Sequence, residues 1–255
     1  MRNHFIMSYF GNKRSECDKI YEQIKDLIEN KNITTIVEPY CGSSAFSYYL
    51  STLYPNKFKY ILNDNDKNLI DLYKIMKDKK KRKKFEVKIN DLAKTITSKD
   101  IYNDIRNKNT LESYYLTRKI YSIRPGLFNL NYKYKEILFN EYPIIEFLEN
   151  EDVEIFNDDA LQIINKYKDN QNALIFLDPP YLALCNDFYS NKDVNIYEHL
   201  YFNKIHNMKS LIVLVLEKIW IIELLFNDYK IKEYNKLYQT TKKKTIHIII
   251  TNELK

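Results

Sequence analysis

The apolar residues of the chain follow two periodicities that alternate along its length. Apolar positions three and four residues apart predict helices over 17–28 and 69–76. Short runs of apolar and β-branched residues predict buried strands at 34–37, 58–62, 153–156, 173–177, 211–216, 231–238 and 245–251. Because strands alternate with helical segments, the pattern predicts an α/β fold with a mostly parallel sheet.

The end of the chain predicts a change of strand direction. Residues 239–244 form a connection short enough for a hairpin, so we expect the last two strands to form an antiparallel hairpin at the C-terminal edge of the sheet. The apolar stretch 211–226 is interrupted by Glu217, Lys218 and Glu223 and is shorter than the roughly 20 residues that a membrane span requires. It therefore predicts a buried strand followed by a helix, and we expect no membrane association.

Composition indicates an intracellular globular protein. With 45% hydrophobic and 29% charged residues, the chain is neither typical of a disordered protein nor of a membrane protein. Residues 1–6 show no apolar signal region, which predicts that the protein is not secreted. Cys17, Cys41 and Cys185 are scattered without a C-x-x-C pair, so we expect reduced thiols and no metal site.

Positive charge is concentrated in one segment that interrupts the α/β pattern. Residues 77–136 hold 17 Lys and Arg against 7 Asp and Glu, a net charge of +10, whereas the whole chain has a net charge of +6. We therefore predict a discontinuous catalytic domain, 1–76 and 150–255, and an inserted, mainly helical recognition subdomain, 77–149.

The basic segment also contains many tyrosines. Cations contact phosphates and aromatic rings stack on bases, so mixing the two suits a nucleic-acid surface. Tyr114, Tyr115 and Tyr134 each lie within four residues of a lysine or arginine there. The run 79–84 by itself is equally typical of a solvated helix end. The predicted nucleic-acid contacts are Lys79, Lys80, Lys83, Lys84, Arg118, Arg124 and Lys133.

The strongest chemical signal is the sequence Asp178-Pro179-Pro180-Tyr181, which directly follows the predicted strand 173–177. Two adjacent prolines fix the backbone and remove two N–H donors, so this turn offers hydrogen-bond acceptors. An exocyclic amine of a nucleobase carries two N–H donors. The Asp178 carboxylate and the Pro179 carbonyl can accept both while Tyr181 stacks on the ring. We therefore predict that these four residues are catalytic.

Other predicted strands also end in small, polar or acidic residues. The turn 38–45 follows the first strand, and Asp64 and Asp159 each follow a later one. Ligands of open α/β sheets bind at the C-terminal ends of the strands, so these turns predict one crevice. Asp64 is either an acceptor for a pair of ribose hydroxyls or the N-cap of the following helix.

In order and spacing, these motifs resemble the Dam-like adenine-specific amino methyltransferases, and the resemblance spans nearly the whole chain. Residues 9–13 resemble the family's Y-x-G-x-K element, 38–44 its E-P-F-x-G-x-G turn, and 63–70 its N-D-x-N-x-x-L-I segment. The resemblance implies a Rossmann-like sheet that binds S-adenosyl-L-methionine. The cofactor-binding residues that it implies are Tyr9, Gly11, Lys13, Glu38, Pro39, Tyr40, Gly42, Ser43, Asp64, Asn65, Asp159, Ala160 and Asp178.

The same resemblance implies direct methyl transfer to the N6 amine of adenine in double-stranded DNA. The target base would leave the duplex to reach the pocket, and no covalent intermediate is needed. The recognition region matches the family only loosely, so no target sequence is predicted. We expect the protein to be a monomer or a weakly associating dimer.

Three alternatives stay open at this point. Adenine in RNA would occupy the same pocket, and cytosine N4 or a guanine amine would also present an exocyclic amine. A catalytically inactive nucleic-acid-binding scaffold of the same fold is suggested by Ser44, which stands where the family has a glycine. A serine is accommodated there if its backbone avoids positive φ.

Overall fold

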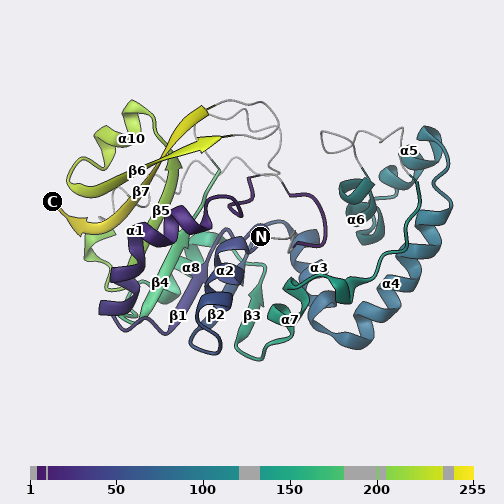
Figure 1. Cartoon of the computed structure of the whole chain (residues 1–255), viewed down its shortest axis with the longest axis horizontal. Helices are drawn as coiled ribbons and strands as arrows, with labels where there is room; N and C mark the ends of the chain where they lie inside the picture. The colour runs from purple at the N-terminus through teal and green to yellow at the C-terminus, as the bar shows by residue number, and fades with distance from the viewer. Residues whose placement is uncertain (1–4, 10, 121–132, 181–199, 201–204, 238–243) are drawn as a thin grey trace. The chain divides into compact units, whose positions relative to one another are not determined.

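A computed structural model describes residues 5–9, 11–120, 133–180, 200, 205–237 and 244–255 (Figure 1). Two compact units make up the chain. The first unit comprises Met1–Asn12 and Lys67–Ile155, and the second comprises Lys13–Asp66 and Phe156–Lys255. The predicted insertion, 77–149, falls inside the first unit.

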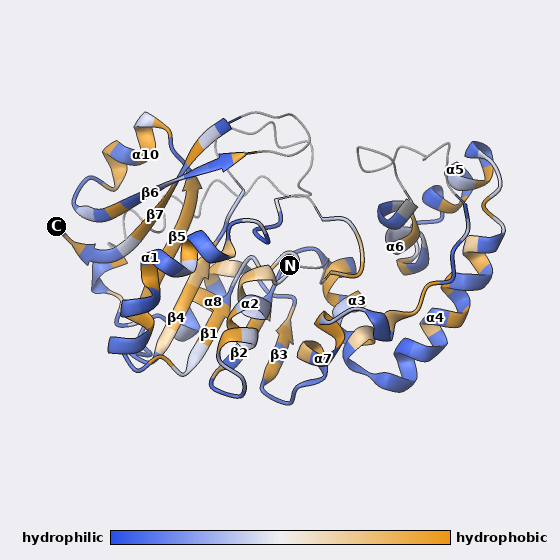
Figure 2. Cartoon of the chain, viewed as in Figure 1, coloured by the Kyte–Doolittle hydropathy of each residue, from blue (hydrophilic) through white to orange (hydrophobic). Residues whose placement is uncertain are grey.

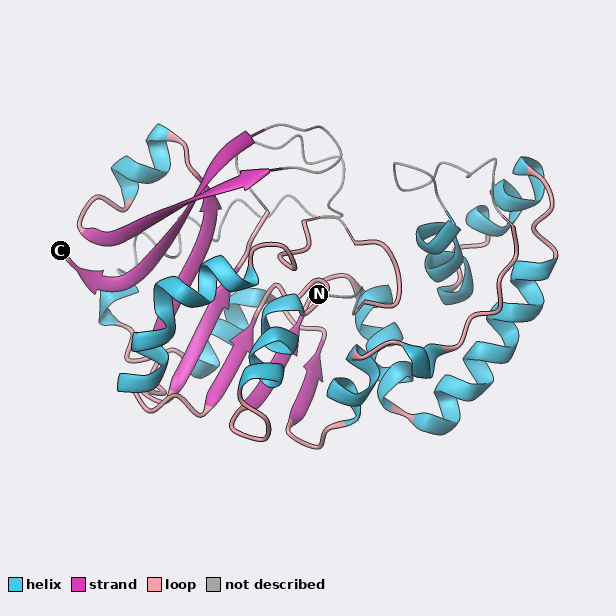
Figure 3. Ribbon diagram, in the orientation of Figure 1, coloured by secondary structure: helices cyan, strands magenta, loops and turns pink. Residues whose placement is uncertain are grey.

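The described strands form one sheet in the order β3-β2-β1-β4-β5-β7-β6. Strands β2, β1, β4 and β5 pair in parallel, whereas β7 is antiparallel to both β5 and β6 (Figure 3). This confirms the predicted mostly parallel sheet with an antiparallel hairpin at its C-terminal edge. The strands are β1 (Thr35–Glu38), β2 (Lys59–Asn63), β3 (Val153–Phe156), β4 (Ala173–Leu177), β5 (Leu211–Glu217), β6 (Tyr229–Leu237) and β7 (Lys244–Leu254).

The described helices divide between the two units. The second unit contains α1 (Cys17–Asn30), α2 (Ala45–Leu53), α8 (Ala160–Tyr167) and α10 (Trp220–Leu225). The first unit contains α3 (Lys67–Lys77), α4 (Lys79–Lys94), α5 (Lys99–Asn107), α6 (Leu111–Ile120) and α7 (Ile144–Glu149). The helices predicted over 17–28 and 69–76 are confirmed as α1 and α3. None of the helices described here combines the length and the hydrophobicity that a transmembrane span requires.

The central strand β4 is apolar along its whole length, as expected for a strand covered by helices on both faces. Every residue of β4 is buried, and Figure 2 shows β4 and β5 as hydrophobic ribbons. Leu177 belongs to a cluster with Ile163 of α8 and Ile222 of α10. Its neighbour Phe176 stacks on Phe46 of α2, with 4.2 Å between ring centroids. Successive side chains of a strand point to opposite faces, so the sheet is the middle layer of the second unit.

The first unit has an aromatic core built from α4, α6 and the short turn Phe139–Glu141. Tyr115 of α6 lies 6.1 Å from Phe85 and 5.4 Å from Phe139, measured between ring centroids. Its side chain is fully buried. Tyr115 therefore stabilises the core, and the interpretation of this ring as part of a base-stacking surface is wrong.

Two buried polar side chains on α4, Glu86 and Asn90, bind the backbone of residues 137–139. The amide of Asn90 donates to the carbonyl of Ile137 at 2.9 Å and accepts from its N–H at 2.8 Å. One turn earlier, Glu86 accepts from the N–H of Phe139 at 2.9 Å. Residues four apart share one helix face, so α4 supplies the partners that a neighbouring strand would otherwise give this extended backbone.

Substitution of Asn90 with alanine should lower the free energy of unfolding by about 2 kcal/mol or more, because it leaves the buried N–H and C=O of Ile137 without these hydrogen bonds. Asn107→Ala is the matched control, since Asn107 is exposed at the end of α5. Urea denaturation measures both. Equal losses for the two variants would contradict a structural role for the Asn90 amide.

Candidate active site

Three adjacent parallel strands, β2, β1 and β4, end at the same edge of the sheet. The segments that leave them carry Asp64 after β2, Glu38 at the end of β1, and Asp178 after β4. Parallel pairing therefore brings these three strand ends together, at the edge where the sequence predicted a ligand crevice.

Asn63, the last residue of β2, ties the loops of this edge together. It is fully buried, and its amide group donates to the carbonyls of Pro39 and Asp158 at 3.0 Å each. The side-chain oxygen Oδ1 of Asn63 accepts from the N–H of Asp158 at 2.8 Å. Sequence reasoning did not select this residue, although a polar residue that closes an apolar strand was a usable signal.

Asp64 binds the small-residue turn that follows β1. Its carboxylate accepts from the N–H of Gly42 at 2.9 Å and from the N–H of Asp66 at 2.9 Å. Gly42 has φ of 47°, which a glycine adopts without a Cβ clash. Burial raises the pKa of Asp64 to about 6, against the opposing effect of these hydrogen bonds. The helix α3 begins at Lys67, so Asp64 braces the turn and is not an N-cap.

Glu38 lies behind the same turn. Its carboxylate accepts from the N–H of Ser47 in the first turn of α2 at 2.7 Å. The side chain is buried, and this burial raises the pKa of Glu38 to about 7. Glu38 thereby supplies the N-terminal acceptor that α2 lacks locally, because the side chain of Ser44 makes no capping bond.

Ser44 adopts φ of 49° and ψ of 33°, in the left-handed region. The condition under which a serine would be readily accommodated here, a backbone that avoids positive φ, is therefore not met. The left-handed conformation brings Cβ close to the following carbonyl oxygen and costs about 1–2 kcal/mol for a residue other than glycine. The turn therefore has at Ser44 the left-handed backbone that favours glycine, although the residue is a serine.

Asp178 forms an ion pair with Lys13. The ammonium of Lys13 lies 2.5 Å from both carboxylate oxygens, and the two side chains are 7% and 17% exposed. Burial raises the pKa of Asp178, and the charge of Lys13 opposes this shift. Pro179 is buried beside it, while Tyr181 lies outside the described residues. The structure thus joins two residues that the sequence had placed in separate motifs.

The remaining predicted ligand residues have mixed local roles. Asp159 caps α8 by accepting from the N–H of Leu161 at 2.7 Å, and Ala160 is buried as the first residue of that helix. Tyr40 is half-buried, Ser43 is buried and Asn65 is exposed, all in the turns described above.

The predicted N-terminal residues Tyr9 and Gly11 belong to the first unit, whereas Lys13 belongs to the second. The ring of Tyr9 meets that of Phe5 edge to face, with centroids 6.0 Å apart. Gly11 is exposed and has φ of 74°, a conformation that favours glycine.

The basic run at the start of α4 divides into structural and surface residues. Arg82 is buried, where it donates to the carbonyl of Met76 and pairs with Glu149 at 2.7 Å. Lys83 pairs with Glu86 on the next turn. The side chain of Lys83 stays largely exposed despite this pair, so the predicted contacts that are exposed are Lys79, Lys80, Lys83 and Lys84 of the run, together with Lys133.

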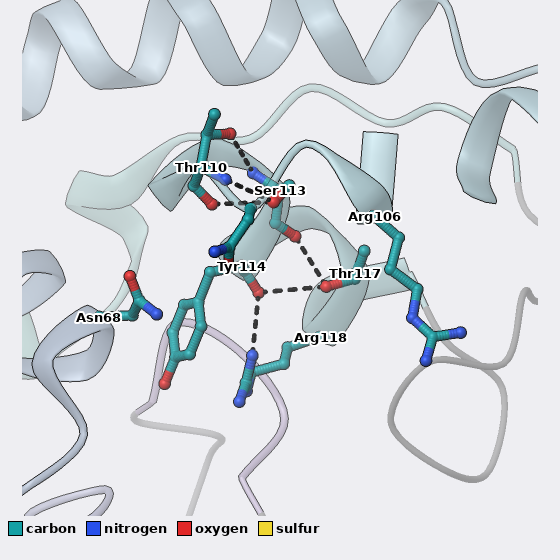
Figure 4. Close-up of a pocket in the computed structure, with 8 residues that line it drawn as sticks. Asn68, Arg106, Thr110, Ser113, Tyr114, Thr117 and Arg118 are labelled. Atoms are coloured by element: carbon teal, nitrogen blue, oxygen red, sulfur yellow. Dashed lines mark hydrogen bonds between the residues drawn. The ribbon is translucent and has the colours of Figure 1, made fainter. Parts of the chain in front are cut away.

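Arg118 lies at a pocket of about 240 Å³ within the first unit (Figure 4). Its guanidinium carbon lies 3.6 Å from the ring centroid of Tyr114, and Arg106 lines the same pocket. The hydroxyls of Ser113 and Thr117 bond to carbonyls of their own helix segment. The pocket therefore combines two cations with an aromatic ring, which suits phosphate and base contacts. Arg124 lies outside the described residues.

Among the residues that the structure describes, no group of three or more His, Cys, Asp or Glu side chains could hold a metal ion. The described thiols, Cys17 and Cys41, are both buried, and burial raises the pKa of each. Neither has the exposed thiolate character of a nucleophile.

Comparison with known proteins gives two matches that cover most of the chain. A family model described as D12 class N6 adenine-specific DNA methyltransferase matches residues 9–249. The type II methyltransferase M.MjaIII of Methanocaldococcus jannaschii is 25% identical over 273 aligned positions, which cover 92% of this chain and 87% of that protein. Both matches include the strand-end turns and the Asp178 segment within their span.

Ser44→Gly should raise the free energy of unfolding by about 0.5–1 kcal/mol, because the glycine relieves the left-handed strain. The variant also loses the hydrogen bond between Ser44 and the Cys41 thiol, but bonds to sulfur are weak. Ser43→Gly is the control, since Ser43 is not at positive φ, and it should destabilise. Thermal and urea unfolding measure both, and a loss of stability in Ser44→Gly would refute the strain.

Proposed function

The chain belongs to the D12 class of N6 adenine-specific DNA methyltransferases, and we propose that it uses S-adenosyl-L-methionine as its methyl donor and Asp178 with Pro179 as the acceptors of the target amine. When bound, that donor supplies an electrophilic methyl group on a sulfonium sulfur. The observation that carries this proposal is a nearly buried carboxylate, Asp178, held at the end of β4 by the ammonium of Lys13.

The amine of adenine is a weak nucleophile because its lone pair is delocalised into the ring. The Asp178 carboxylate and the Pro179 carbonyl accept its two N–H groups, which favours a pyramidal nitrogen with a localised lone pair. Positive charge would develop on this nitrogen as the N–C bond forms and the S–C bond of the donor breaks, until one amine proton is lost. The fixed carboxylate stabilises that charge and costs no reorganisation at the moment of reaction.

Lys13 keeps Asp178 suited to this role. Burial favours the neutral acid, which would present an O–H donor toward the amine. The ammonium of Lys13 favours the carboxylate and orients both of its oxygens. We therefore assign Lys13 to the support of Asp178 as well as to the cofactor region.

The residues at the strand ends fit the proposed donor chemically. Its sulfonium and amino groups are cationic, and Glu38, Asp64 and Asp178 make this edge acidic. Asp64 is half-buried, and each of its carboxylate oxygens accepts from a backbone N–H group. Carboxylate oxygens accept more than one hydrogen bond, so Asp64 can also accept from ribose hydroxyls. Gly42 leaves the turn without a side chain against the ligand.

We further propose that the substrate is double-stranded DNA and that the target adenine leaves the stack. Within a duplex the N6 amine is base-paired and stacked, so the Asp178 carboxylate and the Pro179 carbonyl cannot both accept its N–H groups there. Exposed lysines of α4, Lys133 and the Arg118 pocket supply cations for the phosphates. Phosphate contacts of this kind position a duplex and carry no sequence information by themselves.

Asp178→Asn should lower methyl transfer by at least about 10³-fold, because it replaces a charged acceptor with an amide that also carries donors. Binding of duplex DNA should be retained. Asp169→Asn, at an exposed turn, is the matched control. Mass analysis of nucleosides after incubation with labelled donor and duplex DNA measures N6-methyladenine. Undiminished turnover in Asp178→Asn would refute the assignment.

Combined replacement of Lys79, Lys80 and Lys84 with glutamine should weaken binding of duplex DNA about tenfold or more. Three lost phosphate contacts should also reduce the salt slope of the affinity by about 2–3. The control replaces the exposed Lys57, Lys59 and Lys209 of the second unit, which removes equal charge. Fluorescence anisotropy across a salt series separates the two variants. Equal weakening in both would indicate that these lysines only solvate their helix.

A further inference from the structure

A buried cluster of polar side chains lies where the start of α1 meets the hairpin β6–β7. It contains Glu16 from the turn before α1, Tyr234 and Lys236 from β6, and His247 from β7. None of these residues belongs to the motifs that carry the family resemblance. All of them belong to the second unit.

Glu16 is the centre of this cluster. Its carboxylate lies 2.8 Å from Nδ1 of His247, accepts from the hydroxyl of Tyr234 at 2.8 Å, and pairs with Lys236. Only 2% of Glu16 side chain is exposed. Burial opposes its ionisation, but the bond to His247 and the charges of Lys13 and Lys236 hold the pKa of Glu16 at about 2.

This use of Glu16 departs from the local rule for its position. Glu16 is the N-cap residue of α1, where the side chain of a Ser, Thr, Asp or Asn commonly accepts from an N–H of the first helical turn. It makes no such capping bond. A buried carboxylate costs free energy unless donors surround it, so its full commitment to the hairpin fixes this turn against β6 and β7.

The same turn carries Lys13. The carbonyl of Lys13 accepts from the N–H of Glu16 at 2.7 Å, from the N–H of Cys17 at 3.0 Å, and from the thiol of Cys17 at 3.3 Å. The backbone of Lys13 is therefore fixed to the residue that the hairpin holds. The side chain of Lys13 then reaches Asp178. A continuous set of contacts thus runs from the hairpin, through Glu16 and Lys13, to Asp178.

We propose that Glu16 is a positioning residue that acts through Lys13 to hold the Asp178 carboxylate in its reactive orientation. The inference rests on the proposed function of Asp178. In this arrangement the antiparallel hairpin extends the sheet and also fixes the position of the Lys13 turn, because its side chains bind Glu16.

A double-mutant cycle tests this role, because a residue that acts through another has no effect once that other residue is gone. Glu16→Gln keeps the shape of the side chain and removes its charge. In the wild-type chain it should lower kcat about tenfold and leave KM for DNA unchanged. In a Lys13→Met chain the same substitution should lower kcat less than about twofold.

Glu22→Gln is the matched control, since Glu22 is exposed on α1 and pairs with Lys25 of the same helix, outside the buried cluster. It should leave kcat unchanged in both backgrounds. Tyr234→Phe provides a second variant if Glu16→Gln does not fold. It removes one donor to Glu16 and keeps the ring. Its effect on kcat should likewise disappear in the Lys13→Met chain.

Equal fold-losses in the two backgrounds would overturn the inference, because they would show that Glu16 only stabilises the fold. That result, in a wild-type chain that methylates adenine, leaves the proposed function intact. A wild-type chain that transfers no methyl group to adenine overturns the proposed function and the inference with it. The two failures are therefore distinguishable in the same set of measurements.

Discussion

Parallel pairing of β2, β1 and β4 brings three carboxylates to one edge of the sheet, and the burial of these carboxylates constrains everything around them. A carboxylate removed from water must find hydrogen-bond donors or lose its charge. Glu38 takes the N–H of Ser47, Asp64 takes the N–H of Gly42, and Asp178 takes the ammonium of Lys13. Each donor belongs to a different segment, so the acids hold the strand-end loops in place.

The same burial makes the edge receptive to a cation. Burial raises the pKa of Glu38 to about 7 and that of Asp64 to about 6, so near neutral pH these acids hold their charge at a cost. A cationic ligand lowers that cost because it favours the ionised form. Protons and the proposed sulfonium donor therefore compete at this edge. The burial that disfavours ionisation of these acids in the free protein would therefore favour binding of a positively charged ligand.

The fold was predictable from the sequence where the signals are local. The strands β4 and β5 are continuous apolar runs because helices cover both faces, and such runs are visible without any knowledge of contacts. The strand-end position of Asp178 followed in the same way. The role of Asp64 stayed open, since an Asp before a helix can cap it or bind a ligand. The start of α3 at Lys67 excludes the cap, and the bond to Gly42 shows the turn that Asp64 holds.

Long-range contacts were beyond such reasoning. Tyr115 and Tyr114 are neighbours in one aromatic pattern, yet one fills the core and the other stacks beneath Arg118. Consecutive residues of a helix point their side chains in different directions, and composition does not show which of them faces the core. Glu16 and His247 lie near opposite ends of the chain, and no spacing rule links them. Residues 121–132, which include the predicted contact Arg124, and Tyr181 lie outside the described residues, so the predictions made there remain predictions.

The start of α4 shows how an unfavourable local choice bears on function. The amino end of a helix is already positive, and acids there stabilise it by about 0.3–1 kcal/mol each. The first turn of α4 contains lysines and no acid, and Asp78 alone caps it through the N–H groups of Lys80 and Lys81 at 3.0 Å. Selection for stability alone would remove these lysines. A phosphate at this helix end would be attracted by the lysines and by the positive amino end together, so the charges that repel one another in the free protein would act jointly on a polyanion.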